Sequence, residues 1–465
     1  MAKKLISIPY IYPLCPLNFS HAKMFVVADI LCRFLESKKH KVVFPIASHY
    51  SGNTAQHSSD SILKVLNNKG SQDDKKIYKL HKHTYKTPNY IIETFSNSNN
   101  LLNYYTQEIY WELKSLNTSS DFKHAYSTNH KDFPLFVNEV LTSYQEMGLL
   151  IKNDANDLAL NYDDKKWKRL TKKLIENTLF NENFHKKNVL SAMKNIRNDW
   201  GFLRTTGFGV KYKKKWIIDP MFDSELFTIF DLYIILKKDF KSKITNKKLF
   251  FKRLLKHLKT GSKSKDLLIN AIASHLPCSV FVCEEHIKNW VVKKFYAEQK
   301  LLHPKYRTKK YIFMGMGLLD NKRMSASKGH AILSKDLIGQ HGSTVARLIL
   351  ILSGGNIAKT CNYDKNLPKT ASTMIKRFTP YFIQLVTTST TNKKSSQSLL
   401  SEIKTHSQKL DKLIESGYHR QVAIEILTNI PKVYLKKQKQ TMDVLNFYKK
   451  YLTIILPGFM EKFIS

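Results

Sequence analysis

The first fifty residues carry the pattern that most constrains the fold. Residues 5–12 are rich in β-branched and aromatic side chains, prolines interrupt them at 13–16, and a helical pattern begins near His21. A second apolar run follows at 42–46. A strand, a helix and a second strand within so short a distance predict a parallel α/β unit, because parallel strands need a crossover. In such units ligands bind beyond the carboxyl ends of the strands, at helix N-termini.

The start of the predicted helix offers side chains for binding an anion. Ser20 is a candidate N-cap, whose hydroxyl would accept a hydrogen bond from a free backbone N–H. Asn18 and His21 flank it, and hydrogen-bonding side chains at a helix N-terminus can meet phosphates. The alternative is that His21 only caps or packs against the helix. The buried face of that helix is expected to hold Ala22, Phe25, Val26, Ile30 and Phe34.

The charge of the chain points to a polyanionic partner. The sequence has 465 residues with 76 Lys and Arg against 37 Asp and Glu, a formal net charge of +39. Such a field attracts nucleic acid, because neutralising phosphates releases counterions. A coding bias towards A and T is the alternative explanation for the many lysines. A hydrophobic content of 42% predicts a folded chain rather than a disordered one.

Neither a disulfide framework nor a membrane span is expected. The cysteines are odd in number and scattered, and no run of eighteen apolar residues occurs. The N-terminus enters a strand without a cleavage-site pattern. We therefore expect a soluble, cytoplasmic and monomeric protein. A metal site built from His275, Cys278, Cys283 and His286 is disfavoured, since the spacing is not that of a standard zinc site. The five cysteines are Cys15, Cys32, Cys278, Cys283 and Cys361.

Two short segments far apart in the chain resemble the signatures of a known family. Residues 17–21 read Leu-Asn-Phe-Ser-His, and residues 322–329 read Lys-Arg-Met-Ser-Ala-Ser-Lys-Gly. They resemble the two ATP-binding signatures of class I aminoacyl-tRNA synthetases, His-Ile-Gly-His and Lys-Met-Ser-Lys-Ser. Gly315 and Gly317 precede the second segment at the family's spacing. A lone Gly-x-Gly or a lone basic loop is weak, but the combination is specific.

The flanking residues resemble one branch of that family, the archaeal and eukaryotic cytosolic leucyl-tRNA synthetases. The similarity covers most of 5–150 and 200–355. It includes residues 44–52, which read Phe-Pro-Ile-Ala-Ser-His-Tyr-Ser-Gly. Full-length relatives carry a large editing domain that cannot fit in residues 153–199, a lysine-rich stretch expected to form a solvated linker helix. Further stretches of similarity are 8–12, 22–33, 110–116, 122–128 and 216–225.

The resemblance implies a domain organisation. Residues 1–355 would form a Rossmann-like α/β catalytic domain with a parallel sheet, with a short connective insertion at about 150–199. Residues 356–465 would form an α-helical, tRNA-binding bundle. A polar stretch at 387–398 is expected to be a loop. The helices of the bundle are expected at 371–385, 399–416, 420–429 and 433–456.

The resemblance also implies site residues. Catalytic roles fall to Asn18, His21, Arg323 and Lys328. The amino-acid pocket would include Tyr10, Tyr12, Ser48 and His49. ATP would contact Asn18, Ser20, His21, Cys283, Glu285, Asn289, Gly315, Gly317, Arg323, Met324, Ser325, Ser327 and Lys328, with Glu285 near the ribose.

The sequence departs from the family at several of these positions. Ser20 and Cys283 stand where the family has glycine, and Trp290 stands where it has histidine. Ala326 replaces the second lysine of the signature, so Lys328 is expected to supply that charge. The family's glycine lets the adenine of ATP approach the backbone closely, and the hydroxymethyl group of Ser20 narrows that space.

The implied reaction uses ATP and Mg²⁺ and has two steps. Leucine or a similar aliphatic amino acid is activated as an aminoacyl adenylate, and the aminoacyl group passes to the 3′ end of a tRNA. One alternative is aminoacylation for a pathway outside translation or of another acceptor. The other is a basic RNA-binding protein that no longer adenylates.

Overall fold

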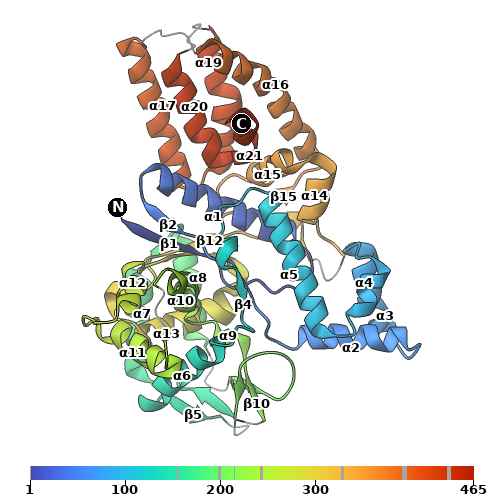
Figure 1. The fold of residues 1–465 in the computed structure, drawn as a ribbon, viewed down its shortest axis with the longest axis vertical. Coiled ribbons are helices and arrows are strands. Elements are labelled where there is room, and N and C mark those ends of the chain that lie inside the picture. The colour runs from blue at the N-terminus through green and yellow to red at the C-terminus, as the bar shows by residue number, and fades with distance from the viewer. Residues whose placement is uncertain are drawn as a thin grey trace.

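Five parallel strands form the central sheet (Figure 1), with the order β2-β1-β11-β12-β7. The computed structural model describes residues 2–153, 157–196, 200–213, 215–240, 244–325, 329–389, 395–436 and 441–464. The α/β class and the parallel sheet predicted from the sequence are confirmed. The strands are β1 (Lys3–Ser7), β2 (Lys41–Val43), β7 (Leu179–Phe180), β11 (Ser279–Cys283) and β12 (Lys310–Met314).

The alternation of side chains along these strands separates two of the buried cores, one on each face of the sheet. Leu5, Val280 and Val282 point to one face of the sheet, where they join one buried cluster. Ile6 and Phe281 point to the other face and join a second cluster. Successive side chains of a strand face opposite sides, so a sheet covered on both faces reads as a continuous apolar run.

The first helix, α1 (Phe19–Ser37), makes the predicted crossover from β1 to β2. Its N-cap is Asn18, not Ser20: Asn18 Oδ1 accepts a hydrogen bond from the His21 N–H at 2.9 Å. Ser20 already lies within the first helical turn, so the expectation that it caps the helix was wrong. The strand is also shorter than predicted, because the chain leaves the sheet after Ser7 and Ile11 bridges to Ser48 instead.

The described part of the segment at 153–199 is not a solvated linker helix, which corrects that expectation. It contains β7, the edge strand of the central sheet, and α7 (Lys165–Asn177). Trp167 of α7 is fully buried, and its indole N–H donates to the Tyr296 carbonyl at 3.0 Å. Trp167, Thr171 and Ile175 recur on one face of the helix, while lysines cover the other.

The remaining elements surround the sheet. The helices α2 (Thr54–Leu66), α3 (Gln72–Lys79), α4 (Asn89–Thr94) and α5 (Ser98–Ser115) form the lobe at the right of Figure 1. Two small sheets have two strands each: β3 (Ala47–Ser48) pairs with β4 (Tyr126–Ser127), and β5 (Leu150–Lys152) pairs with β6 (Leu158–Leu160). Two others have three strands each. In one, β10 (Trp216–Ile218) lies between β8 (Leu203–Arg204) and β9 (Lys211–Tyr212), and in the other, β13 (Gly317–Leu319) lies between β14 (Lys322–Arg323) and β15 (Cys361–Tyr363).

Further helices cover the sheet or connect its strands. They are α6 (Phe133–Glu146), α8 (Asn183–Lys194), α9 (Pro220–Asp223), α10 (Phe227–Asp239), α11 (Lys247–Thr260), α12 (Leu267–Ser274), α13 (Val292–Leu301), α14 (Ser334–His341) and α15 (Ser343–Leu352). Single 3₁₀ or π turns occur at Leu80–Thr84, Phe122–His124, Glu284–His286, Ile287–Val291, Pro304–Tyr306 and Glu425–Asn429.

The C-terminal region is helical, as predicted, and forms the upper part of Figure 1. Its helices are α16 (Leu367–Thr388), α17 (Gln397–Glu415), α18 (His419–Ile424), α19 (Ile430–Lys436), α20 (Met442–Ile455) and α21 (Pro457–Ile464). Residues 390–394 of the predicted loop lie outside the described residues. Within the described ranges, no helix combines the length and apolar character that a bilayer span requires.

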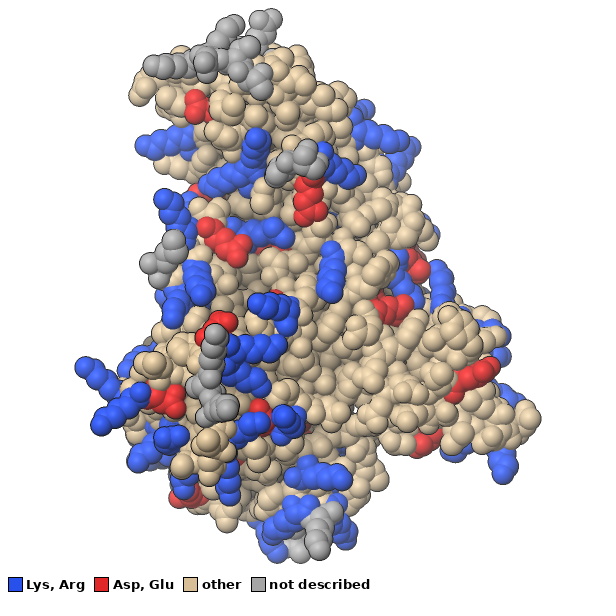
Figure 2. Space-filling model, in the orientation of Figure 1, with Lys and Arg blue, Asp and Glu red and all other residues tan. Residues whose placement is uncertain are grey.

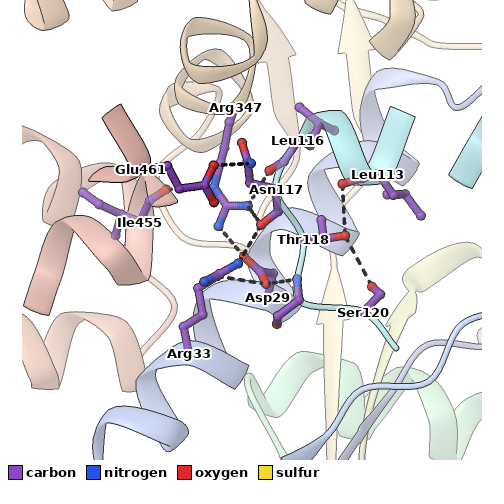
Figure 3. Close-up of polar contacts among 11 residues, drawn as sticks. Asp29, Arg33, Leu113, Leu116, Asn117, Thr118, Ser120, Arg347, Ile455 and Glu461 are labelled. Carbon is purple, nitrogen blue, oxygen red and sulfur yellow. Dashed lines mark hydrogen bonds and ion pairs between the residues drawn. The ribbon is translucent and has the colours of Figure 1, made fainter. Parts of the chain in front are cut away.

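A buried ionic network ties α1 to the bundle (Figure 3). Asp29 accepts hydrogen bonds from Arg347, from Arg33 at 3.0 Å and from the Ser119 N–H at 2.6 Å. Arg347 also donates to the carbonyl of Ile455, at the end of α20, at 2.8 Å. Burial pushes the pKa of Asp29 up, but Arg347 and Arg33 outweigh it and hold the pKa below its usual value. The network joins the helix after the first signature to the last helices of the chain.

Candidate active site

A cavity of about 410 Å³ opens at the carboxyl ends of β1 and β11. The chain leaves β1 through α1 towards β2 on one side and leaves β11 through α13 towards β12 on the other. The strand order therefore reverses between β1 and β11, which is where open α/β sheets bind their ligands. Of the residues predicted for the site, Tyr10, Tyr12, His21, His49, Cys283, Glu285 and Asn289 line this cavity.

The first signature segment lies at the edge of the cavity. Asn18 caps α1, as described above, and fixes the first helical turn, from which His21 reaches the cavity wall. Burial lowers the pKa of His21, although the nearby Glu285 carboxylate opposes the shift. The lowered pKa favours the neutral imidazole, which can donate one N–H bond to an anion. The position of His21 fits both a packed side chain and a phosphate contact.

The first signature segment meets β13, the strand before the second segment, through Ser20 and Gly317. A Cβ on Gly317 would lie 2.0 Å from Ser20 Oγ, so a larger residue here would force the Ser20 hydroxyl to move. Gly315 is similarly restricted, because a Cβ there would lie 2.3 Å from the backbone of Lys359. Both predicted glycines thus serve close packing, and among the described residues neither belongs to the cavity wall. Ser20 occupies the space beside Gly317.

The second signature segment meets the cavity through an ion pair. Arg323 of β14 forms a salt bridge with Glu285, which lines the cavity. The side chain of Arg323 is 60% exposed and that of Glu285 is 32% exposed, so the pair adds at most about 1 kcal/mol of stability. Breaking it therefore costs little. Met324 is buried beside it, whereas Ser327 and Lys328, with Ala326, lie outside the described residues.

Aromatic rings form the other end of the cavity. The Tyr10 and His49 ring centroids lie 5.3 Å apart, and the Tyr12 ring lies 4.7 Å from that of His49. His49 Nε2 is 2.8 Å from Asp223 Oδ1, and both side chains are buried. Burial raises the pKa of Asp223, while His49 opposes the shift. Ser48 lies behind this wall, fully buried, with its hydroxyl 3.4 Å from that of Tyr110.

Several wall residues were missed by sequence reasoning. Trp290 donates its indole N–H to Ser224 Oγ at 3.0 Å, and the Ser224 hydroxyl donates to the Pro220 carbonyl at 2.5 Å. These residues line the cavity together with Met221 and His286. The similarity at 216–225 was a signal for the segment. It could not identify which side chains face the cavity.

A buried carboxyl group is hydrogen-bonded, through Tyr126, to the aromatic end of the cavity. Asp231 of α10 accepts a hydrogen bond from the Tyr126 hydroxyl at 2.7 Å, and that hydroxyl is 2.8 Å from the hydroxyl of Tyr10. Burial raises the pKa of Asp231 to about 7, despite the hydrogen bonds from Tyr126 and Ser7. The carboxyl group is therefore largely protonated below neutral pH.

Raising the pH is expected to weaken the fold through Asp231. Its folded-state pKa of about 7 lies above the usual value of 3.8, so its contribution to stability is complete below about pH 4 and is lost as the pH rises through 7. The free energy of unfolding, relative to Asp231→Asn, should fall by up to about 1.4 kcal/mol per pH unit in this window.

Urea unfolding across that pH window measures the difference. Asp73→Asn is the control, because the Asp73 side chain is 86% exposed, and it should leave the pH dependence unchanged. A constant difference between the wild-type protein and Asp231→Asn would contradict the prediction.

Comparisons with known proteins show what the chain is similar to. No family model matches the chain. Leucine–tRNA ligase 2 of Sulfurisphaera tokodaii is 24% identical over 151 residues, which are 32% of this chain and 15% of the relative. Leucine–tRNA ligase 1 of Saccharolobus solfataricus is 27% identical over 152 residues, 33% of this chain and 15% of the relative. The match thus spans only a small part of the length of these curated relatives.

The fold resembles a solved structure over nearly its whole length. Methionyl-tRNA synthetase of Mycobacterium tuberculosis, bound by methionyl-adenylate, covers 99% of this chain with a TM-score of 0.66, and the alignment covers 93% of that structure. The sequence identity is 11%. The sequence relatives are thus leucine enzymes and this structural neighbour is a methionine enzyme. The chain has the fold of class I aminoacyl-tRNA synthetases, and a third of it is related in sequence to leucyl-tRNA synthetases.

Proposed function

We propose that this protein activates an amino acid with ATP and transfers it to the 3′ end of a tRNA. One observation carries the proposal: a single cavity at the reversal point of the sheet is lined by His21 and Glu285 at one end and by Tyr10 and His49 at the other. Two substrates held there would meet between β1 and β11. Holding reactants together in this way removes much of the entropic barrier.

In the first step the amino-acid carboxylate attacks the α-phosphorus of ATP, and the bond to pyrophosphate breaks. Negative charge develops on the leaving group, and cations fixed there stabilise the transition state. His21 would donate an N–H to the phosphates, while Arg323 and Lys328 would hold the pyrophosphate. In the second step a ribose hydroxyl of the tRNA takes the aminoacyl group and AMP leaves.

Mg²⁺ fits this proposal as a partner of the nucleotide. In the part of the chain that the structure describes, no three His, Cys, Asp or Glu side chains gather as metal ligands would. The phosphate oxygens of ATP are suitable ligands for Mg²⁺, which keeps several waters when bound in this way. The ion would neutralise phosphate charge beside His21.

The cavity wall favours an apolar amino acid, leucine or a similar aliphatic one. Tyr10, Ser224 and Trp290 carry polar groups, but each of these groups already hydrogen-bonds within the protein. Much of what remains for a substrate side chain is ring and methylene surface, including that of Met221. A polar side chain placed there would lose its hydrogen bonds to water without replacement.

The tRNA part of the proposal depends on charge. The net charge is +39, and on the face drawn in Figure 2 Lys and Arg extend from the bundle down over the catalytic part. Residues 1–355 would carry catalysis and residues 356–465 would dock the tRNA. Binding of this kind weakens steeply with salt.

ATP–pyrophosphate exchange across a panel of amino acids tests the first step. We expect exchange with leucine or another aliphatic amino acid and none without an amino acid. If no amino acid in the panel supports exchange, adenylation is contradicted and the alternative of a basic RNA-binding protein is left. Transfer to a total tRNA pool then separates tRNA charging from an unconventional acceptor.

A further inference from the structure

One buried carboxyl group joins the two chain segments that carry the nucleotide signatures. Glu112 of α5 accepts a hydrogen bond from the Leu17 N–H at Oε1, at 3.1 Å, and from the Ser334 hydroxyl at Oε2. Leu17 directly precedes the capping residue of α1. Ser334 begins α14, the helix that follows the second signature. The side chain of Glu112, from a third element, thus contacts the start of α1 and the start of α14.

Backbone hydrogen bonds continue this contact. The Ser334 N–H donates to the Leu17 carbonyl at 2.8 Å, and the Phe19 N–H donates to the Ile332 carbonyl at 2.8 Å. Asn18 and Leu333 form an isolated antiparallel bridge between them. The first signature segment and residues 332–334, which follow the second signature segment, are therefore paired like two short strands. Glu112 closes one end of that pairing.

The buried position of Glu112 is unfavourable for a carboxyl group, so its two hydrogen bonds are needed to offset the cost of burial. Glu112 has no exposed surface, and burial raises its pKa to about 8, although the Ser334 hydroxyl pulls the other way. Burying such a group is unfavourable unless it is hydrogen-bonded. Both oxygens are used here, one by Leu17 of the first signature segment and the other by Ser334, which begins the helix after the second. The neighbouring Glu108 is bonded to Lys335 at 2.8 Å and so does not compete for these donors.

We propose that Glu112 is a positioning residue for ATP. By holding Leu17 and Ser334 together it fixes the start of α1, which presents His21, against the start of α14, which follows β14 and Arg323 in the chain. Small misplacements of groups that bind a reacting phosphate are expensive in rate. The role in catalysis rests on the proposed adenylation; the linkage of the two segments does not.

Glu112→Ala removes both hydrogen bonds and should raise the KM for ATP in pyrophosphate exchange by about tenfold or more. The KM for the amino acid should change by less than about twofold, because Tyr10 and His49 come from other segments. Glu112→Gln keeps an acceptor for Leu17 and a polar partner for Ser334, so it should restore most of the affinity. Ser334→Ala, a milder change, should raise the KM for ATP by about threefold.

Glu139→Ala is the matched control. Glu139 is a buried glutamate on α6 whose pKa is also raised by burial, but it is outside both signature segments. It should leave both KM values unchanged even if it lowers stability. Equal effects of Glu112→Ala on the two KM values, or no rescue by glutamine, would overturn the proposal.

Hydrogen exchange separates this proposal from the proposed function. In Glu112→Ala the amides of 17–19 and 332–334 should exchange faster than in the wild-type protein, without any substrate. If the wild-type enzyme exchanges no pyrophosphate but these amides respond as expected, adenylation fails and the linkage stands. If the enzyme is active and neither the amides nor the KM for ATP respond, the linkage is wrong. Should Glu112→Ala not fold, Ser334→Ala gives the same two readouts.

Discussion

Arg347→Ala is expected to lower the free energy of unfolding by about 3 to 5 kcal/mol, because it leaves Asp29 charged and buried without its main partner. Asp29 has no exposed surface, and the side chain of Arg347 is 1% exposed. The substitution also removes donors to the carbonyls of Leu116 and Ile455, each at 2.8 Å. Urea unfolding followed by circular dichroism measures the loss.

Arg33→Ala is the matched control, since Arg33 binds the same carboxylate from a side chain that is 19% exposed. We expect a loss of about 1 kcal/mol, because water can replace this partner. Replacing Asp29 and Arg347 together by Leu and Met should recover much of the stability. Equal losses from Arg33→Ala and Arg347→Ala would show that burial does not set the strength of this network.

The elements near the start of the chain could be predicted because their signals are local. The apolar spacing of α1 and the short strands on each side of it depend on residues close in sequence. The choice of Asn18 over Ser20 as the N-cap was not accessible, since both residue types cap helices well. Only the path of the chain from Ser7 decides which of them is the last residue before the helix.

The segment at 150–199 shows where a composition argument fails. Its many lysines suggested a helix in water, yet Trp167 and Ile175 place an apolar face against α13. Counting charges averages over the faces of a helix, whereas packing depends on one face. The edge strand β7 is too short to give any periodic signal.

The candidate site divides in the same way. His21 and Glu285 could be predicted because each lies in a recognisable segment, and the fold brings both to one cavity. The contacts of Trp290, Asp223 and Glu112 could not be predicted, because each joins residues more than sixty positions apart in the chain. Such contacts exist only once the sheet and its helices have assembled. Lys328 remains a prediction from the sequence.

These networks suggest how the cavity keeps its shape without a substrate. The aromatic end is held by Tyr126 and Asp231, and the nucleotide end by Asn18 and Glu112. The Arg323–Glu285 pair, at the same end of the cavity as His21, is more exposed than these networks. Rigid walls suit the proposed reaction, which would be catalysed mainly by positioning.

His21→Ala is expected to lower kcat/KM for ATP in pyrophosphate exchange by about tenfold to a thousandfold, which corresponds to about 1.4 to 4 kcal/mol of transition-state stabilisation. The neutral imidazole lies at the N-terminus of α1, where it would add an N–H to the donors that already favour phosphate. Lys328→Ala should cause a loss of similar size, since it removes the charge expected on the leaving pyrophosphate.

His57→Ala is the control, because His57 is an exposed histidine on α2, and it should leave kcat/KM unchanged. His21→Ala removes a small side chain next to the cavity, so circular dichroism should show an intact fold and the loss should be one of rate. A normal kcat/KM in both His21→Ala and Lys328→Ala would mean that ATP binds elsewhere. A loss in His21→Ala alone would keep the first signature and assign the pyrophosphate to Arg323 instead.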